Sequence, residues 1–123
     1  MKLWLSVAAF SGFLAVALGA FGAHGLASRA TPEELNAFEI GARYQMYHAL
    51  ALLAVAWLAT QGNSALVATA GWAFVVGTLL FSGSLYVLGL TGSRALVLVT
   101  PMGGGAFMLG WICLFVRALK LPG

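Results

Sequence analysis

The residues of this sequence that could do chemistry are polar side chains near the ends of long apolar stretches. Polar groups are costly in hydrocarbon, so each one placed there needs a structural or functional cause. Glu39 and Arg43 are four residues apart, as are Tyr44 and His48, and this spacing puts each pair on one helix face. We predict a single hydrogen-bonded cluster, because facing inward together spares such side chains from contact with lipid. Its members are His24, Glu39, Arg43, Tyr44, Gln45, His48, Ser82, Ser84, Tyr86 and Thr100.

The predicted role of this cluster is to bind a lipid head group or another small molecule from one side of the bilayer. A second interpretation is structural, with hydrogen bonds between helices that hold a bundle together. A third uses His24 and His48 as ligands of a haem or a metal, with Met46 or Met102 as soft auxiliary ligands. A haem needs facing ligands and a wide cleft, which close packing through glycine opposes. We therefore expect no cofactor and no metal site.

Catalysis is the class of function that the sequence supports least. It contains no nucleophile beside a base on a recognisable turn, no metal-ligand spacing and no phosphate-binding loop. The 6 Lys and Arg residues exceed the 3 acidic residues, for a formal net charge of +3, but they are scattered singly and form no basic stripe. We expect neither an enzyme nor a nucleic-acid-binding protein.

The composition indicates an environment of lipid. Of the 123 residues, 62% are hydrophobic and only 7% are charged, whereas a soluble domain has about 25% charged residues. Ionised side chains are absent from the intervals 3–28, 44–93 and 95–116. A helix needs about 20 apolar residues to cross a bilayer, so these intervals hold one, two and one crossings.

The predicted fold class is an all-α membrane protein, a four-transmembrane-helix bundle that forms a single domain over residues 1–123. An even number of crossings puts both termini on the same face of the membrane. A cleaved signal peptide is the alternative for the first crossing, but its apolar stretch exceeds the roughly 7 to 15 residues of a signal core. The crossings are expected at 3–26, 44–60, 66–90 and 95–119, with short polar turns at 61–64 and 91–94.

The long connection after the first crossing contains all three acidic residues and a helix-start signal. Thr31 can cap a helix, Pro32 suits its first turn, and Glu34 can complete a capping box. We predict a short amphipathic helix between helices 1 and 2, from Pro32 to about Gly41. It would lie at the membrane surface or run straight into the second crossing.

Aromatic residues support the predicted topology, because Trp and Tyr favour membrane interfaces. Trp4, Trp57 and Trp111 fall toward the face that holds the termini. Tyr44 and Tyr86 fall toward the opposite face. Each face has three Lys or Arg residues, so the positive-inside rule gives a tie. We favour cytoplasmic termini because the cations near the chain ends have no acidic neighbours.

Small residues predict close contacts between helices, since close backbone approach favours association in lipid. Ala15 and Gly19 are spaced four residues apart on the first crossing and belong to such a stripe. Pro101 precedes three glycines at 103–105. We predict that the fourth helix is kinked or locally opened at this point.

Four motifs, in this order, are typical of a known family. They are the segments 19–26 (GAFGAHGL), 44–51 (YQMYHALA), 81–86 (FSGSLY) and 100–104 (TPMGG). On these motifs, and over nearly its whole length, the chain resembles the YgdD-like small membrane proteins, the domain of unknown function numbered 423. The resemblance implies a multi-pass protein of the bacterial inner (cell) membrane. It implies no settled activity, cofactor or catalytic residue.

Two classes of function follow as expectations. The first is a non-enzymatic membrane protein that binds membrane lipids, a second copy of itself or another membrane protein through its polar half. The alternative is a small transporter or channel for a small molecule or ion, necessarily oligomeric because four short helices leave little room for an aqueous path. An ionised residue at the bilayer midplane would favour transport. None is expected there, so we favour the first.

Overall fold

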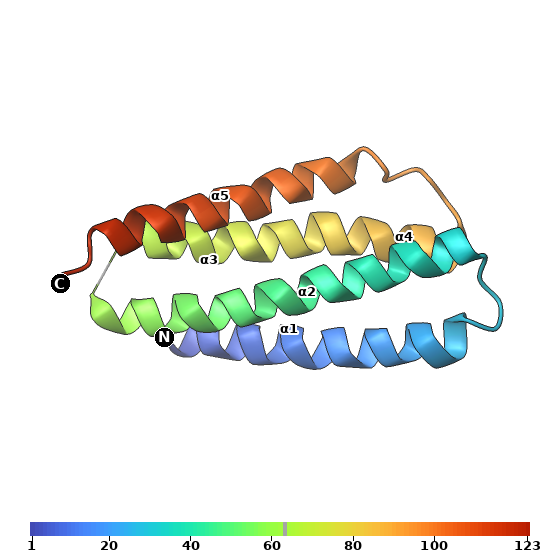
Figure 1. Ribbon diagram of the computed structural model, residues 1–123, viewed down its shortest axis with the longest axis horizontal. Coiled ribbons are helices and arrows are strands. Elements are labelled where there is room, and N and C mark those ends of the chain that lie inside the picture. The colour runs from blue at the N-terminus through green and yellow to red at the C-terminus, as the bar shows by residue number, and fades with distance from the viewer. Residues whose placement is uncertain (63) are drawn as a thin grey trace.

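The computed structural model describes residues 1–62 and 64–123, which form four long helical rods packed side by side (Figure 1). Both termini lie at one end of the bundle, and the two longer connections lie at the other (Figure 1). The first rod is α1 with η1, the second is α2 with η2, the third is α3, η3 and α4, and the fourth is α5. The elements are α1 (Lys2–Phe21), the π-helical turn η1 (Gly22–Leu26), α2 (Pro32–Leu58), the short 3₁₀ turn η2 (Ala59–Gln61), α3 (Ala65–Gly77), the π-helical turn η3 (Thr78–Ser82), α4 (Gly83–Thr91) and α5 (Val99–Leu119).

The second rod, α2, lies at the centre of the bundle. It packs against α1 on one side and against α3, η3 and α4 on the other, while α5 packs on the outside of α3 and η3. More residues are buried on α2 than on any other rod, including Phe38 and Val55 with no exposed surface. The central position matters because α2 is also the rod with the most polar and charged side chains.

The start of α2 follows the predicted capping box. The Glu34 backbone N–H donates to Thr31 Oγ1 at 3.1 Å, and the Thr31 N–H donates to Glu34 Oε1 at 3.0 Å. From Pro32 the helix continues without a break to Leu58. The short amphipathic helix predicted from Pro32 to about Gly41 is therefore not a separate element between helices 1 and 2, because nothing after Gly41 interrupts the α-helix. It forms the first turns of the second rod.

Three of the rods are long and apolar enough to cross a membrane. They are Lys2–Leu26, Ala65–Thr91 and Val99–Leu119. The central rod is not among them, although it is long enough, because polar and charged residues such as Glu39 and Arg43 lower its hydropathy. The structure thus supports an all-helical membrane fold with three apolar spans, and the role of α2 is a separate question.

The first and third rods have nearly the boundaries predicted for their crossings. The second rod begins at Pro32 rather than at residue 44, because the capped helix before the predicted crossing is continuous with it. The fourth helix begins later than predicted, at Val99, because residues 95–98 form turns in which the Val97 N–H donates to the Arg94 carbonyl at 3.2 Å. Gly92 ends α4 with a left-handed φ of 71°, which glycine adopts without strain. The predicted turn at 61–64 includes Asn63, which lies outside the described residues.

The predicted kink at Pro101 is wrong. Pro101 lies in the first turn of α5, where its missing N–H removes no helical hydrogen bond, so the helix stays regular. Gly103 packs so closely on the Phe81 backbone of η3 that a side chain would have no room. The irregular turns are instead the π-helical ones, η1 and η3.

The small-residue stripe on α1 packs closely against another helix, as predicted, and that helix is α2. Ala15 is 3% exposed, and a Cβ placed on Gly19 would lie 4.0 Å from the Ala42 Cβ. These contacts bring the first two rods close together along their length (Figure 1).

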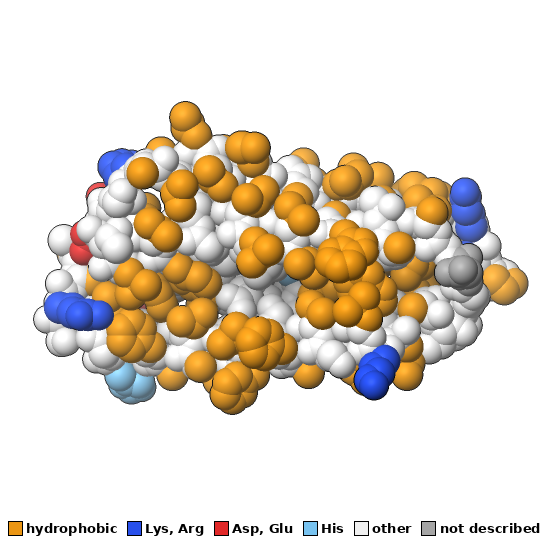
Figure 2. All heavy atoms as spheres, turned by 180° about the vertical axis from the view of Figure 1, so that it is seen from behind, with side chains coloured by type: hydrophobic (Ala, Val, Ile, Leu, Met, Phe, Trp, Pro, Cys, Tyr) orange, Lys and Arg blue, Asp and Glu red, His pale blue; other side chains and the backbone are white. Residues whose placement is uncertain are grey.

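The outer surface of the bundle is apolar. Figure 2 shows hydrophobic side chains over the middle of one long face, with charged side chains near the two ends. Phe13 is 70% exposed and Leu98 is 79% exposed. Such a surface suits lipid, which needs no polar cover and which replaces water around exposed apolar side chains.

Candidate functional site

Gln45 connects three rods through hydrogen bonds near the middle of the bundle. Its Nε2 donates to the Ser11 carbonyl of α1 at 2.9 Å, and the Tyr86 hydroxyl of α4 donates to its Oε1 at 2.6 Å. The Ser11 carbonyl can only accept, so the amide must present its nitrogen to α1. Gln45 is 4% exposed, and these bonds explain how an amide can be buried there.

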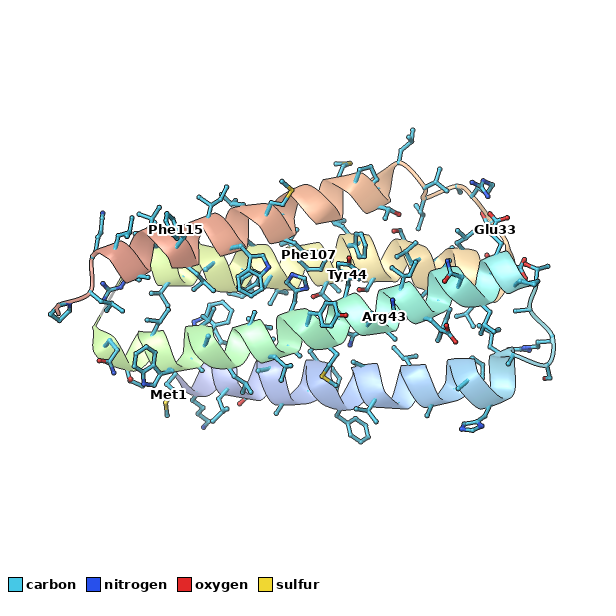
Figure 3. All side chains as sticks on the ribbon, viewed as in Figure 1. Met1, Glu33, Arg43, Tyr44, Phe107 and Phe115 are labelled. Carbon is cyan, nitrogen blue, oxygen red and sulfur yellow. The ribbon has the colours of Figure 1, made fainter. Side chains whose placement is uncertain are left out.

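His48 lies one turn further along α2, among aromatic side chains. Its ring stacks on Phe107 of α5, with centroids 3.5 Å apart and planes at 5°. Trp111 Nε1 donates to His48 Nε2 at 3.1 Å, and His48 Nδ1 bonds the Tyr44 carbonyl at 2.7 Å. Figure 3 shows Tyr44 and Phe107 in the space between α2 and α5.

These bonds assign the proton of His48. An indole N–H only donates and a carbonyl only accepts, so Nε2 is the unprotonated nitrogen and Nδ1 has the hydrogen. The imidazole is therefore neutral, and both nitrogens are already engaged. This arrangement leaves no nitrogen for a haem or metal, and the described residues contain no group of three or more His, Cys, Asp or Glu placed to hold a metal.

The two serines and the threonine of the predicted cluster form hydrogen bonds at other contacts. Ser82 Oγ donates to the Gly41 carbonyl at 2.7 Å and joins η3 to α2. Ser84 Oγ donates to the Phe81 carbonyl at 2.8 Å, so the Thr100 hydroxyl must be the donor in its hydrogen bond to Ser84. The Ser82–Gly41 and Thr100–Ser84 bonds each join two rods, whereas the Ser84–Phe81 bond lies within the third rod. Bonds between rods are what the structural interpretation of the polar residues predicts.

The polar residues thus do not form the single cluster that the sequence predicts. His24 is exposed at the end of the first rod, Arg43 is exposed on α2, and Glu39 is half-buried. In the described part of the chain, no ion pair or hydrogen bond joins Glu39 to Arg43. Both line a shallow hollow on the outer side of the α1–α2 contact, away from Gln45 and His48. Figure 3 shows Arg43 between the middle of α2 and the loop end.

A lateral groove opens between α1 and the third rod, and we call it the α1–η3 groove. Its volume is about 380 Å³. Nearer the termini, Trp4 of α1 packs on Gly71 of α3 and meets Trp72 edge-on with ring centroids 5.2 Å apart. The residues that line it are Val7, Phe10, Ser11, Leu14, Leu18, Gln45, Leu52, Val75, Thr78, Leu79, Gly83 and Tyr86.

The α1–η3 groove contains an unpartnered polar atom. Thr78 Oγ1 is buried and has no hydrogen bond, although the hydroxyl of a helical threonine can bond a carbonyl three or four residues earlier. Thr78 is the first residue of the π-helical turn η3, and such turns are frequent at functional sites. With Gln45 and Tyr86 it forms a small polar area in an otherwise apolar groove.

A family model described as a protein of unknown function, DUF423, matches residues 18–104. The chain belongs to this family. This confirms the resemblance that the four motifs indicate, and 87 of the 123 residues lie within the match (104 − 18 + 1).

Relatives from several bacteria extend the similarity over nearly the whole chain. The UPF0382 membrane protein YwdK of Bacillus subtilis is 46% identical over 98% of each chain. A UPF0382 membrane protein of Haemophilus influenzae is 44% identical over 95% of this chain and 94% of its own. The UPF0382 inner membrane protein YgdD of Escherichia coli is 41% identical over 98% of this chain and 92% of its own. This DUF423 member is thus a membrane protein, and no solved structure matches it.

Four contributors to these contacts are not among the predicted site residues: Ser11, Thr78, Phe107 and Trp111. Ser11 contributes only a backbone carbonyl, which no sequence pattern reveals. The preference of tryptophan for membrane interfaces predicts that Trp111 lies near the bilayer surface. In the structure its indole N–H instead donates to His48 near the middle of the bundle. Thr78 could have been found from the sequence, because it precedes the predicted site residue Ser82 by four residues and residues at this spacing share a helix face.

Proposed function

We propose that this protein crosses the bilayer four times and binds a membrane lipid in the α1–η3 groove. It would lie in the bacterial inner membrane with both termini in the cytoplasm. The groove is the observation on which the lipid-binding proposal depends, because it opens sideways to the surface that lipid would cover.

The proposal that α2 is the fourth crossing is supported by its place in the bundle. It lies between α1 and the third rod and packs against both (Figure 1). Its polar residues Gln45 and His48 are turned inward and bonded to neighbouring rods, so they need not meet lipid. The low hydropathy of this rod is thus compatible with a crossing, because its polar side chains are shielded by protein.

Reporter fusions at the two ends test the topology. Four crossings put both termini in one compartment, so green fluorescent protein should fluoresce at either end and alkaline phosphatase should be inactive at both. Opposite results for the two termini would mean three crossings, with α2 outside the hydrocarbon.

Lipid binding is supported by the shape and chemistry of the groove. Its lining is mostly apolar, and it has no Lys, Arg, Asp or Glu. The side chains that line an empty groove lack partners for dispersion contacts. An acyl chain that enters the groove from the bilayer provides these contacts, so its binding is favoured. A groove of this size falls within the roughly 300 to 1,000 Å³ of typical ligand sites.

Filling the groove tests this proposal. Gly83 lines it, and a Cβ at Gly83 would meet nothing within 4 Å, so Gly83→Leu places a side chain in open space. Gly105 of α5 also has nothing within 4 Å but does not line the groove, so Gly105→Leu is the matched control. Native mass spectrometry from phospholipid nanodiscs should show several-fold less retained lipid for Gly83→Leu and no change for Gly105→Leu. Equal retention by both variants would overturn lipid binding in this groove.

A further inference from the structure

Two side chains that line the α1–η3 groove each have a hydrogen-bond donor for which the described part of the chain provides no acceptor. One is the buried hydroxyl of Thr78. The other is the second N–H of the Gln45 amide, because the first donates to Ser11 and the amide oxygen accepts from Tyr86. Both residues line the same groove. Free donors in apolar surroundings favour a ligand that brings an acceptor.

These donors lie near the middle of their rods. Gln45 is midway along α2 (Pro32–Leu58), and Thr78 is midway along Ala65–Thr91. If the rods span the bilayer as proposed above, the donors lie near its midplane, about 15 Å from either edge of the hydrocarbon core. The ester carbonyls of a phospholipid stay near that edge, so a phospholipid can bring only its tail to this depth.

The acceptor must belong to a neutral molecule. No charged side chain lines the groove, and a charge placed there would be buried without a counter-charge. Beside the donors, Gly83 leaves open space and Tyr86 presents an aromatic ring. Aromatic rings pair by offset stacking or by edge-to-face contact, which suits a flat partner.

We propose that the α1–η3 groove binds a membrane quinone, with a ring carbonyl between Thr78 and Gln45 and the apolar tail along the α1 wall. This inference rests on the proposed lipid-binding function and narrows its ligand to a neutral, lipid-soluble carbonyl compound. It concerns binding only. The π-helical turn would then have a direct role, because it begins at the threonine whose hydroxyl is left free for the ligand.

The test uses the full-length protein in phospholipid nanodiscs with decylubiquinone as the probe. Thr78→Val keeps the shape of the side chain and removes the donor, whereas Thr78→Ser keeps the donor. Thr69→Val is the matched control, because Thr69 is exposed and lines a different hollow, between α3 and α5. We expect Thr78→Val to weaken quinone binding by about five- to tenfold, the effect of one hydrogen bond. Thr78→Ser and Thr69→Val should bind as the unaltered protein does.

Two further measurements separate a ligand contact from a structural one. Without quinone, Thr78→Val should melt at the same temperature or higher, since it replaces an unpartnered buried hydroxyl by a methyl group. Binding of 1-phenyldecane, which has a tail of the same length and no carbonyl, should be unaffected by Thr78→Val.

The outcomes distinguish this inference from the proposed function. Equal quinone affinities for the unaltered protein and Thr78→Val would overturn the inference, as would a quinone that binds no better than phenyldecane. If Gly83→Leu still lowers phospholipid retention in that case, lipid binding stands and only the quinone is wrong. If Gly83→Leu changes neither ligand, both proposals fail.

Discussion

The inward and outward sides of α2 contain similar residues in very different surroundings. On the inward side, Gln45 and His48 are each 4% exposed and hydrogen-bonded to neighbouring rods. On the outward side, Arg43 and Tyr47 are exposed, and Tyr47 has half of its surface free. The comparison teaches that polarity alone does not assign a membrane residue to a site. The side of the helix on which the residue lies decides this.

The same contrast separates the two hollows that flank the α1–α2 pair. The α1–η3 groove has a neutral lining with free donors at mid-depth. The other hollow, of about 410 Å³, lies over the outward side and contains both Glu39 and Arg43. A neutral lipid-soluble ligand suits the first. The charges of the second are closer to the loop end, where long side chains can extend toward water.

The largest expected change in stability comes from comparing substitutions at two glycines of α5, one on each side of that helix. Gly103→Val drives a side chain into the Phe81 backbone, which cannot move aside as a flexible side chain could. We expect a loss of about 3 kcal/mol of stability, the upper part of the range for overpacking. Gly105→Val has open space and should change stability by less than about 0.5 kcal/mol. Unfolding in detergent, followed by circular dichroism, measures both.

Similar losses for the two glycine variants would contradict the assignment of the inward side of α5. An equal effect would mean that Gly105 also lies against protein, for example in an oligomer. Cross-linking of the unaltered protein in membranes would identify that arrangement.

A smaller effect is expected when the comparison is made on α2 itself. His48→Leu keeps a buried apolar side chain but leaves the Trp111 N–H without its acceptor. The expected cost is about 2 kcal/mol. Tyr47→Leu, one residue away on the outward side, should cost less than about 0.5 kcal/mol. Melting temperatures in the same detergent provide the comparison, and equal shifts would mean that the His48 bonds do not stabilise the bundle.

Much of the fold could be predicted from the sequence because its signals are local. Uncharged intervals predict the apolar rods, and the Thr31 capping box predicts the start of α2. The errors also have local causes. Pro101 breaks a helix only in its interior, and its place in the first turn of α5 depends on where the preceding turn ends.

The candidate site was harder to predict, because it depends on how each rod is rotated against its neighbours. Successive residues of an α-helix point about 100° apart, so adjacent residues such as Tyr44 and Gln45 face different surroundings. The spacing of polar residues shows which of them share a helix face. It does not show which face packs against another rod. Partners far apart in the chain, such as Gln45 with Tyr86, follow only from the packed bundle.

The smallest expected effect concerns a polar contact at the loop end of the bundle, between the first turn of α2 and the connection before α5. Arg94 Nη1 bonds Glu33 Oε1 at 2.8 Å, but the two side chains are 66% and 70% exposed. Water competes for both charges, and exposed pairs contribute about 0 to 1 kcal/mol. Arg94→Gln should therefore lower stability by less than about 0.5 kcal/mol. Glu33→Gln should lower it slightly more, because Glu33 lies in the first turn of α2, where a negative charge also favours the helix N-terminus. Melting at low and high salt measures both, and salt should reduce the two differences because it screens exposed charges.

A loss above about 1 kcal/mol for Arg94→Gln would mean that this loop contact, although exposed, stabilises the bundle as the inward hydrogen bonds do. The distinction between inward and outward polar contacts would then not hold.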